Sequence, residues 1–419
     1  MSLRERSGLQ TTDQKRWDRP WLLVFGTVFV CAWSGNQFSP MLLLYQHLEH
    51  YSASTVTLFL GIYVLGLAPA LVIAGAVSDH SGRRRPLMCA VIFGLAGSLL
   101  LALGEFGSAP IYLGRLLSGM SVGTAMAVGT SWLKEVSQAP YDPTADHGAG
   151  ARRASLAFTL GSALGALVAG CIAQWGPWPE ILPYVIHAAV ALPFLWLIRR
   201  PPETVFAGTQ RPPMRTRMAG PSARHRRFLR VVLVCGPWLF IACGLSYGYQ
   251  PVLLSDATGD LGLAYATALS VIALVSGALV QPLAKRIDST SSARGIVVSL
   301  ALLIVGLLVM MTAVGLDSWV VGVVASVVFG GGFGIGLVSG LLEVQRIAPP
   351  AELAKLTGIF YAVAYLGFIV PTILAALTPP FTTMQLLSVL VGLLIVSTLV
   401  VLRGYRRHLP RPHIPQHPL

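Results

Sequence analysis

Long apolar segments recur along the chain, separated by short polar breaks. Each is close to the about 20 residues that a helix needs to cross a bilayer. Several contain Gly or Pro, which membrane-spanning helices tolerate better than helices in water. We therefore predict twelve spanning helices, at 21–45, 54–78, 86–104, 109–133, 154–175, 180–198, 229–254, 262–284, 294–314, 319–342, 353–378 and 383–402.

The composition supports a membrane protein. Hydrophobic residues make up 54% of the chain and charged residues only 11%, against about 25% charged in soluble domains. So few charges could not cover the surface of a soluble protein, whereas a bilayer solvates apolar surface directly. The sequence therefore predicts an all-α membrane protein and excludes an ordinary soluble enzyme.

Basic residues mark alternate breaks between the apolar segments. All but one of the 30 Lys and Arg residues lie in the two terminal segments and in every second loop, and the exception is Arg115. The remaining loops carry acidic residues, namely Glu49, Glu105, Glu180, Asp256, Asp260 and Asp317. Because basic residues collect in cytoplasmic loops, we predict a multi-pass protein of the cell membrane with both termini in the cytoplasm.

The predicted domain organisation follows from these breaks. The first apolar segment is longer than the core of a signal peptide, so we interpret it as a retained helix. A Pro- and Arg-rich stretch divides the other segments into two groups of six and is expected to be flexible. The predicted units are a cytoplasmic segment at 1–20, a six-helix bundle at 21–198, a cytoplasmic linker at 199–228, a second bundle at 229–402 and a cytoplasmic tail at 403–419.

The net charge of +13 does not indicate a nucleic-acid partner, because the basic residues are spread over separate segments and not gathered on one face. Contacts with anionic membrane lipids explain them better. The five cysteines lie in apolar segments without a paired spacing, which favours small buried side chains over a metal site or disulfides. We expect no cofactor, no metal and no catalytic residues, and no phosphate-binding loop for ATP is present in the sequence.

An internal repeat relates the two predicted bundles. The end of the second helix reads Gly75-Ala-Val-Ser-Asp79-His-Ser-Gly82-Arg83-Arg84, and the end of the eighth reads Gly277-Ala-Leu-Val-Gln281-Pro-Leu-Ala284-Lys285-Arg286. The two segments align without gaps at the same topological position. Duplication of a six-helix unit is typical of parallel-repeat transporters.

The first of these segments carries a family resemblance. Gly75-x-x-x-Asp79-x-x-Gly82-Arg83-Arg84-Arg85 resembles the signature loop of the major facilitator superfamily, at its proper place between the second and third helices. With the helix count and topology, the resemblance covers roughly residues 20 to 403. It implies two pseudo-symmetric six-helix bundles, the major facilitator fold.

The resemblance also implies a cytoplasmic gate. Gly75 would let the eleventh helix approach closely, and Asp79 would face the positive N-terminus of that helix. Gly82 would allow a tight turn, and Arg83 would pair with a carboxylate, for which Glu135 is our candidate. These contacts would hold the cytoplasmic side closed in the outward-open state. The alternative is that the arginines serve only as orientation signals.

Arg115 lies within the fourth predicted helix. A charge at membrane depth costs at least about 2.5 kcal/mol and usually serves a function. Its context, Arg115-Leu-Leu-Ser-Gly119, resembles an element of proton-coupled members, in which the arginine influences proton exchange or organises a polar network. The alternative is that Arg115 snorkels to the nearby outer interface.

The fifth helix also resembles a family element. Its stretch from Gly161 to Gly170 is similar to the antiporter signature of drug exporters, but Ala166 replaces the proline, which weakens that assignment. Helix packing through small residues explains the same glycines.

The resemblance places a substrate cavity near the midplane, lined by the first, fourth, seventh and tenth helices. Our candidates there are Asn36, Gln37, Tyr247, Tyr249 and Gln250, each of which could equally bond a neighbouring helix. His187 is interpreted as a packed, hydrogen-bonded histidine. No Asp or Glu falls in the middle of a predicted helix, which favours neutral or anionic substrates over organic cations.

These predictions together describe a monomeric secondary active transporter that works by alternating access. We expect proton-coupled export of small apolar, neutral or anionic molecules, with protons and a small-molecule substrate as partners. The alternatives are a proton-coupled importer or a uniporter of a small metabolite. A non-transporting membrane sensor or scaffold is a more remote alternative, since it would need a folded domain outside the helices.

Overall fold

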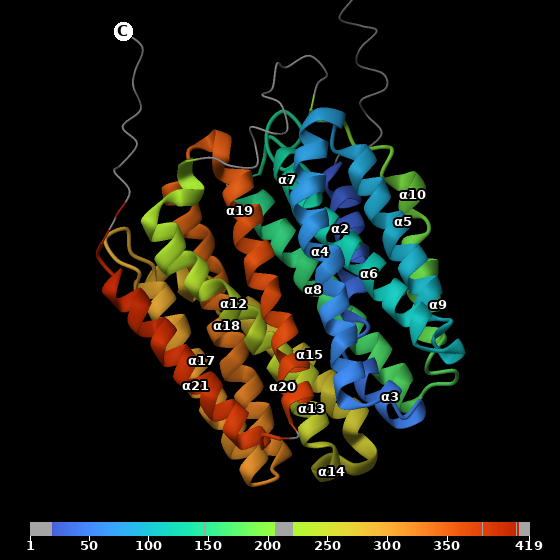
Figure 1. Ribbon diagram of the computed structural model, residues 1–419. Helices are drawn as coiled ribbons and strands as arrows, with labels where there is room; N and C mark the ends of the chain where they lie inside the picture. Colours follow the sequence, from blue (N-terminus) through green and yellow to red (C-terminus); the bar gives the residue numbers. More distant parts are fainter. Residues whose placement is uncertain (1–18, 146–147, 206–220, 379, 408, 410–419) are drawn as a thin grey trace, which may run out of the picture.

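The computed structural model describes residues 19–145, 148–205, 221–378, 380–407 and 409, and within these ranges the chain is helical, with no strand. Two helical bundles lie side by side, the first drawn in blue to green and the second in yellow-green to red (Figure 1). Between the bundles the chain runs through residues 206–220, which lie outside the described ranges.

The first bundle holds the helices up to Leu197. Their bounds are α2 Trp21–Asn36, α3 Met41–Leu48, α4 Ala53–Ser81, α5 Arg84–Leu101, η2 Gly104–Phe106, α6 Ser108–Thr124, η3 Ala125–Gly129, α7 Thr130–Glu135, α8 Ala149–Trp175, α9 Leu182–Ala191 and α10 Phe194–Leu197.

The second bundle holds the remaining helices. Their bounds are η4 Pro221–Arg224, η5 Phe228–Val232, α12 Leu233–Cys243, η6 Gly244–Tyr249, α13 Gln250–Leu253, α14 Ser255–Thr258, η7 Gly259–Leu261, α15 Gly262–Leu279, α16 Gln281–Ile287, α17 Arg294–Gly315, α18 Trp319–Ile347, α19 Pro350–Tyr365, η8 Leu366–Ile369, α20 Val370–Leu377 and α21 Thr383–Arg403.

Eleven of the twelve predicted helices are long and apolar enough to cross a membrane. The sixth is shorter than predicted, because α9 ends at Ala191 and only the single turn of α10 follows Pro193. A proline has no N–H to continue the helix hydrogen bonds and its ring clashes with the preceding turn. The all-α prediction and the succession of spans are confirmed.

Several spans change helix type near their middle. The fourth contains the π segment η3, the seventh contains the π segment η6, and the eleventh contains the 3-10 segment η8. The first span bends at residues 37–40, ahead of α3. Such segments are frequent at functional sites, because they free backbone groups and re-aim side chains. Three of the four helices predicted to line the cavity are interrupted in this way.

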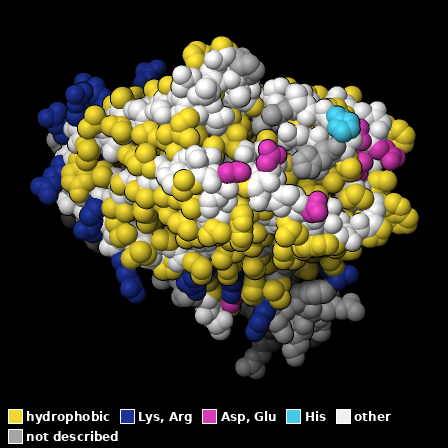
Figure 2. All heavy atoms as spheres, turned by 90° about the horizontal axis from the view of Figure 1, so that it is seen from below, with side chains coloured by type: hydrophobic (Ala, Val, Ile, Leu, Met, Phe, Trp, Pro, Cys, Tyr) yellow, Lys and Arg dark blue, Asp and Glu magenta, His cyan; other side chains and the backbone are white. Residues whose placement is uncertain are grey.

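The two ends of the molecule differ in charge. We call the end that carries Arg83, Lys134, Lys285 and the C-terminal segment the basic end, and the opposite end, with Glu49 and Asp317 in its loops, the acidic end. A view onto the acidic end shows acidic side chains across the face and Lys and Arg only around the rim (Figure 2). The broad apolar belt between the ends matches a multi-pass membrane protein.

Most of the contact between the two bundles comes from two pairs of spans: α4 packs on α19, η8 and α20, and α8 packs on α15. Within the first bundle, α4 and α6 approach so closely at Gly119 that a Cβ there would collide with the backbone carbonyl of Tyr63. Small residues allow this approach where lipid supplies no hydrophobic driving force between helices.

The ends of the predicted linker differ from expectation. Residues 201–205 are bound to the first bundle, where the backbone carbonyls of Pro201 and Pro202 accept hydrogen bonds from Arg84 and from the Trp132 indole, at 2.9 and 3.0 Å. Arg227, at the other end, is only 1% exposed. The expectation of a flexible linker is therefore wrong for these two ends, and its middle lies outside the described residues.

The cysteines also differ from expectation in part. Cys31, Cys235 and Cys243 are buried, but Cys89 and Cys171 are exposed on the outer surfaces of α5 and α8. All five are free thiols. An exposed side chain in a spanning helix meets lipid, which solvates a thiol as an apolar group.

The second bundle is held together at its basic end by a buried ion pair. The Arg227 guanidinium donates to both carboxylate oxygens of Glu343, at 2.7 and 2.6 Å, and to the carbonyl of Arg407, at 3.2 Å. The two side chains are 1% and 2% exposed. Arg346 bonds Glu343 at 3.4 Å and also pairs with Asp288. The cluster ties α18 to the chain ahead of η5 and to the end of α21.

We predict that Glu343→Gln lowers the stability of the second bundle strongly, because it leaves Arg227 buried without its carboxylate. Removing one partner of a buried pair costs about 3–5 kcal/mol. Thermal unfolding of the purified protein in detergent should show a clearly lower Tm. The control is Arg227→Met combined with Glu343→Met, which removes both charges and should recover much of the loss. Equal Tm values for Glu343→Gln and the unchanged protein would contradict this account.

Candidate functional site

The motif residues at the end of α4 form an ion-paired cluster. The Arg83 guanidinium lies against Glu135 at the end of α7, with N–O distances of 2.8 and 3.3 Å. It also bonds Asp79 at 2.9 Å and the hydroxyl of Ser78 at 2.6 Å. Two parallel hydrogen bonds to one carboxylate are the strong form of this pairing. The structure thus brings together the Arg83 and Glu135 pair that the sequence predicted.

Burial and pairing act in opposite directions on Arg83. Burial lowers the pKa of the guanidinium, but Glu135 and then Asp79 outweigh burial and raise it above its ordinary value. The arginine therefore stays charged, and its carboxylate partners determine its position.

Gly82 makes the turn between α4 and α5. Its φ is +88°, a conformation that side chains disfavour, and a Cβ there would lie 2.6 Å from a carboxylate oxygen of Glu203. That carboxylate accepts the backbone N–H groups of Arg83 and Arg84, at 2.8 and 3.1 Å. A carboxylate on the first N–H groups of a helix satisfies donors that have no partner within the helix.

Sequence reasoning missed two residues of this cluster, Glu203 and Thr204. The Thr204 hydroxyl donates a hydrogen bond to Glu135. Both fall in the stretch predicted as linker, where a lone Glu gives no periodic signal. The available clue was that Glu203 follows the last span of the first bundle and lies among Pro and Arg residues. We call Asp79, Arg83, Glu135 and Glu203 the loop cluster.

The predicted contact of Gly75 with the eleventh span is not seen. Among the described side chains, the nearest atom to a Cβ at Gly75 is the Cβ of Ala127, at 3.7 Å, in the same bundle. The contact between α4 and α19 that the structure does show lies nearer the centre, where Leu71 packs against Gly358. Gly75 therefore packs on η3 here.

Arg115 is buried at membrane depth. Its guanidinium donates to the carbonyl of Gly35 at 3.0 Å and to that of Phe59 at 3.1 Å, and it lies over the rings of Phe38 and Tyr63 at 4.6 and 4.4 Å. The side chain is 1% exposed. Snorkelling to the interface is therefore excluded, and Arg115 ties the first, second and fourth spans together. In the described part of the chain it forms no ion pair.

The candidates in α2 and just after it bond within the first bundle. Asn36 donates to the hydroxyl of Ser162 at 2.9 Å, and Gln37 donates to that of Ser98, also at 2.9 Å. Ser98 in turn bonds Nδ1 of His187 at 2.7 Å, and Nε2 of His187 lies 3.0 Å from the carbonyl of Val30. A carbonyl only accepts, so Nε2 donates this bond. His187 is thus a packed, hydrogen-bonded histidine, as predicted.

The candidates in η6 and α13 are buried in the second bundle. Gln250 donates to the hydroxyl of Tyr265 and to the carbonyl of Gly322, at 3.1 and 2.9 Å. Tyr247 and Tyr249 are 3% and 2% exposed, and the ring of Tyr247 lies 6.3 Å from that of Phe368. Substrate contact by these residues and by the pair in the first bundle stays a prediction.

Among the described residues, five neutral hydrogen bonds join the two bundles. Near the centre, the Tyr365 hydroxyl donates to the sulfur of Met126 at 3.2 Å. Towards the basic end, Ser155 donates to Gln281 at 3.0 Å. Gln281 aligns with Asp79 in the internal repeat, so the second bundle has an amide where the first has a carboxylate.

The acidic end holds the other three. Gln174 in α8 donates to the carbonyl of Asp260 at 2.7 Å and accepts the N–H of Ala264 at 2.8 Å. Thr372 donates to the carbonyl of Thr57 at 2.7 Å. Each side chain here bonds backbone of the opposite bundle, so the contact depends on the relative position of the two bundles.

The comparisons with known proteins agree with this architecture. The family model of the Major Facilitator Superfamily matches residues 23–372. No curated protein matches the sequence significantly. The chain belongs to the Major Facilitator Superfamily and is a membrane transporter of that class.

Solved structures share the fold at low identity. A mutant of the nucleoside transporter NupG matches with a TM-score of 0.73 and 13% identity, over 92% of this chain and 99% of that one. A D-xylose-proton symporter matches with a TM-score of 0.67 and 17% identity, over 93% and 98%. A POT family transporter in complex with 5-aminolevulinic acid matches with 0.73 and 13%, over 93% and 96%. At these identities the likeness establishes the fold alone.

We predict that Arg83 and Glu135 are energetically coupled. A hydrogen bond between charged groups is worth about 1.5–3 kcal/mol, and since Glu135 is 29% exposed, solvent screening reduces this to about 1 kcal/mol. Unfolding of Arg83→Gln, Glu135→Gln and the double variant should give a coupling of that size. A control cycle that pairs Arg83→Gln with Glu105→Gln, at the opposite end, should give none. Equal coupling in the two cycles would contradict the assignment.

Proposed function

We propose that this chain is a proton-coupled exporter of small apolar, neutral or anionic molecules, and that it works by rocking its two bundles against each other. The observation that carries the proposal is the distribution of charge contacts. Every ion pair among the described residues lies within one bundle, whereas the hydrogen bonds between bundles are neutral.

This distribution suits alternating access. A neutral hydrogen bond contributes only about 0.5–1.5 kcal/mol net, whereas breaking a buried ion pair costs about 3–5 kcal/mol. The contacts that must break and re-form between bundles are therefore the weak ones. Two conformations that differ by a few kcal/mol are both accessible to a transporter.

The chemistry of the centre supports the choice of substrate. Phe240 stacks on Tyr365 with ring centroids 3.8 Å apart, and Phe368 lies beside both. Among the described residues of the first bundle, Arg115 is the one buried charge at membrane depth, and it has no carboxylate partner there. An aromatic, weakly polar interior with a cation nearby favours apolar, neutral or anionic molecules over organic cations.

Asp79 is the best candidate to couple protons to movement. Its side chain is 31% exposed beside Arg83 at the basic end, which we assign to the cytoplasm. Glu343, the other candidate carboxylate, forms ion pairs with two arginines and is almost fully buried. Protonation of Asp79 would weaken its bond to Arg83 and so change the loop cluster.

Import and uniport are the competing functions. The symporter and the nucleoside transporter above are named for the substrates that those proteins carry, and at 17% and 13% identity they do not determine the direction of transport here. A sensor or scaffold is disfavoured, because membership of a transporter family covers most of the chain.

Inverted membrane vesicles containing the protein test the proposal. We expect that adding a substrate from a panel of lipophilic compounds and small metabolites to energised vesicles releases protons, seen as recovery of a quenched pH-sensitive dye. Asp79→Asn should abolish the recovery, because the side chain can no longer exchange a proton. Asp142→Asn, on another loop of the basic end, is the matched control and should retain it.

The opposite results would overturn the proposal. Movement of the substrate towards the cytoplasmic side, together with protons, would establish import. Substrate equilibration without proton movement would establish uniport. No response from folded protein across the whole panel would remove the support for an exporter of this substrate class.

A further inference from the structure

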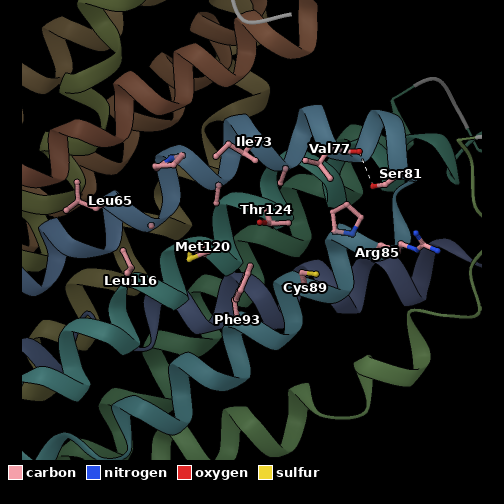
Figure 3. A pocket seen from close by; sticks show the side chains of 15 residues that line it. Leu65, Ile73, Val77, Ser81, Arg85, Cys89, Phe93, Leu116, Met120 and Thr124 are labelled. Atoms are coloured by element: carbon pink, nitrogen blue, oxygen red, sulfur yellow. Dashed lines mark hydrogen bonds between the residues drawn. The ribbon is translucent and has the colours of Figure 1, made fainter. Parts of the chain in front are cut away.

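An apolar groove runs along the outside of the first bundle, away from the contact between bundles. Its walls come from α4 and α5, its floor comes from α6, and its volume is about 530 Å³ (Figure 3). Leu65, Ile73 and Val77 line one wall and Cys89 and Phe93 the other, with Met120 on the floor. The volume lies within the range of about 300–1,000 Å³ that small-molecule sites occupy.

The groove is open to the surroundings of the bundle. Leu65, Ile73 and Val77 are 57%, 50% and 39% exposed, and Cys89 is exposed on the facing helix. These side chains lie in spans, so lipid is their solvent. An occupant that enters from the bilayer therefore meets no barrier.

The basic end of the groove is polar. Two residues stand at its mouth (Figure 3). They are Ser81, the last residue of α4, and Arg85, an exposed residue in the first turn of α5. The Ser81 hydroxyl bonds the Val77 carbonyl at 3.0 Å. Arg83 is fully engaged in the loop cluster, whereas the bonds of Arg84 go to Glu203 and Pro201. Of the three consecutive arginines, Arg85 is the one that lines the groove.

The groove is longer than the hydrocarbon part of one leaflet. The residues that line it on α4 run from 65 to 81, which is about 24 Å of helix at 1.5 Å per residue. One leaflet contributes about half of the roughly 30 Å hydrocarbon core. The groove thus begins at the interface, at Arg85, and is long enough to hold the whole acyl chain of a lipid in that leaflet.

We propose that this groove is a binding site for one anionic phospholipid, with its phosphate at Arg85 and an acyl chain between α4 and α5. The charge and the shape are complementary: a single cation at the interface stands above an apolar channel long enough for an acyl chain. In the second bundle the repeat position of Arg85 is Ile287, so the headgroup contact has no counterpart at that position.

Occupation would act on the loop cluster. The groove and the cluster share the turn between α4 and α5, since Ser81 and Arg85 flank Gly82 and Arg83. A chain wedged between the two helices fixes their separation, and this separation sets the position of Arg83 against Glu135. The lipid would therefore favour the conformation in which the loop cluster is formed.

The exposed thiols allow a direct test. Cys89 lines the groove, and Cys171 lies on the outer surface of α8, so it serves as the internal control; the other three cysteines are buried. The protein is placed in nanodiscs of phosphatidylcholine with or without phosphatidylglycerol. The rate of maleimide labelling is measured at each thiol by mass spectrometry of the digested protein.

We expect phosphatidylglycerol to slow labelling of Cys89 several-fold and to leave Cys171 unchanged. Arg85→Gln should raise the amount of phosphatidylglycerol needed for half protection about fivefold, since one basic residue near an anionic surface contributes about 1 kcal/mol. Arg286→Gln, an exposed arginine at the basic end of the second bundle, should not change it.

Three results would overturn the proposal. Equal slowing at both cysteines would mean a general effect of the bilayer. Protection that Arg85→Gln leaves intact would remove the headgroup contact. Protection by a transported compound, but not by phosphatidylglycerol, would make the groove a substrate entrance. Because labelling is measured without transport, failure here is distinguishable from failure of the proposed function.

Discussion

The pairing of charges within each bundle is the constraint on which the rest of the structure depends. A charge near the bilayer is tolerated only with a partner or access to water, and here each bundle supplies the partners of its own arginines. Arg83 is held by Asp79 and Glu135, and Arg227 by Glu343. The bundles are thereby stabilised as separate bodies, and the contact between them is left to small residues and neutral hydrogen bonds.

The two bundles use this constraint differently, although an internal repeat in the sequence relates them. In the first, the ion pairs surround the turn after α4, and the end of the linker closes them through Glu203. In the second, Gln281 replaces the carboxylate and bonds across to Ser155, while the ion pairs move to the start of η5 and the end of α18. The asymmetry leaves a carboxylate, Asp79, near the end of α4, where the second bundle has the amide of Gln281.

Much of this could be predicted from the sequence, because the dominant signals are local. The recurring apolar segments predicted the spans, and the family resemblance predicted that Arg83 pairs with a carboxylate, for which Glu135 was the candidate. The burial of Arg115 could not be predicted, because depth depends on which helices surround it. Glu203 was missed because a linker residue that folds back onto a turn leaves no periodic pattern. The hydrogen bonds of Gln37 and Gln250 could not be predicted either, because they depend on which spans lie beside them.

Distances between the bundles test the central claim, which is that the bundles move as rigid bodies about a neutral interface. Spin labels are placed at Gln138 and Arg286 for the basic end and at Phe106 and Leu316 for the acidic end, after replacement of the exposed Cys89 and Cys171. Pulsed electron resonance should show that Gln174→Ala, which removes a contact at the acidic end, lengthens the acidic-end distance and shortens the basic-end distance. Distances within one bundle, between Gln138 and Phe106, should not change. If the distance within the bundle changes as much as those between bundles, the rigid-body account is contradicted.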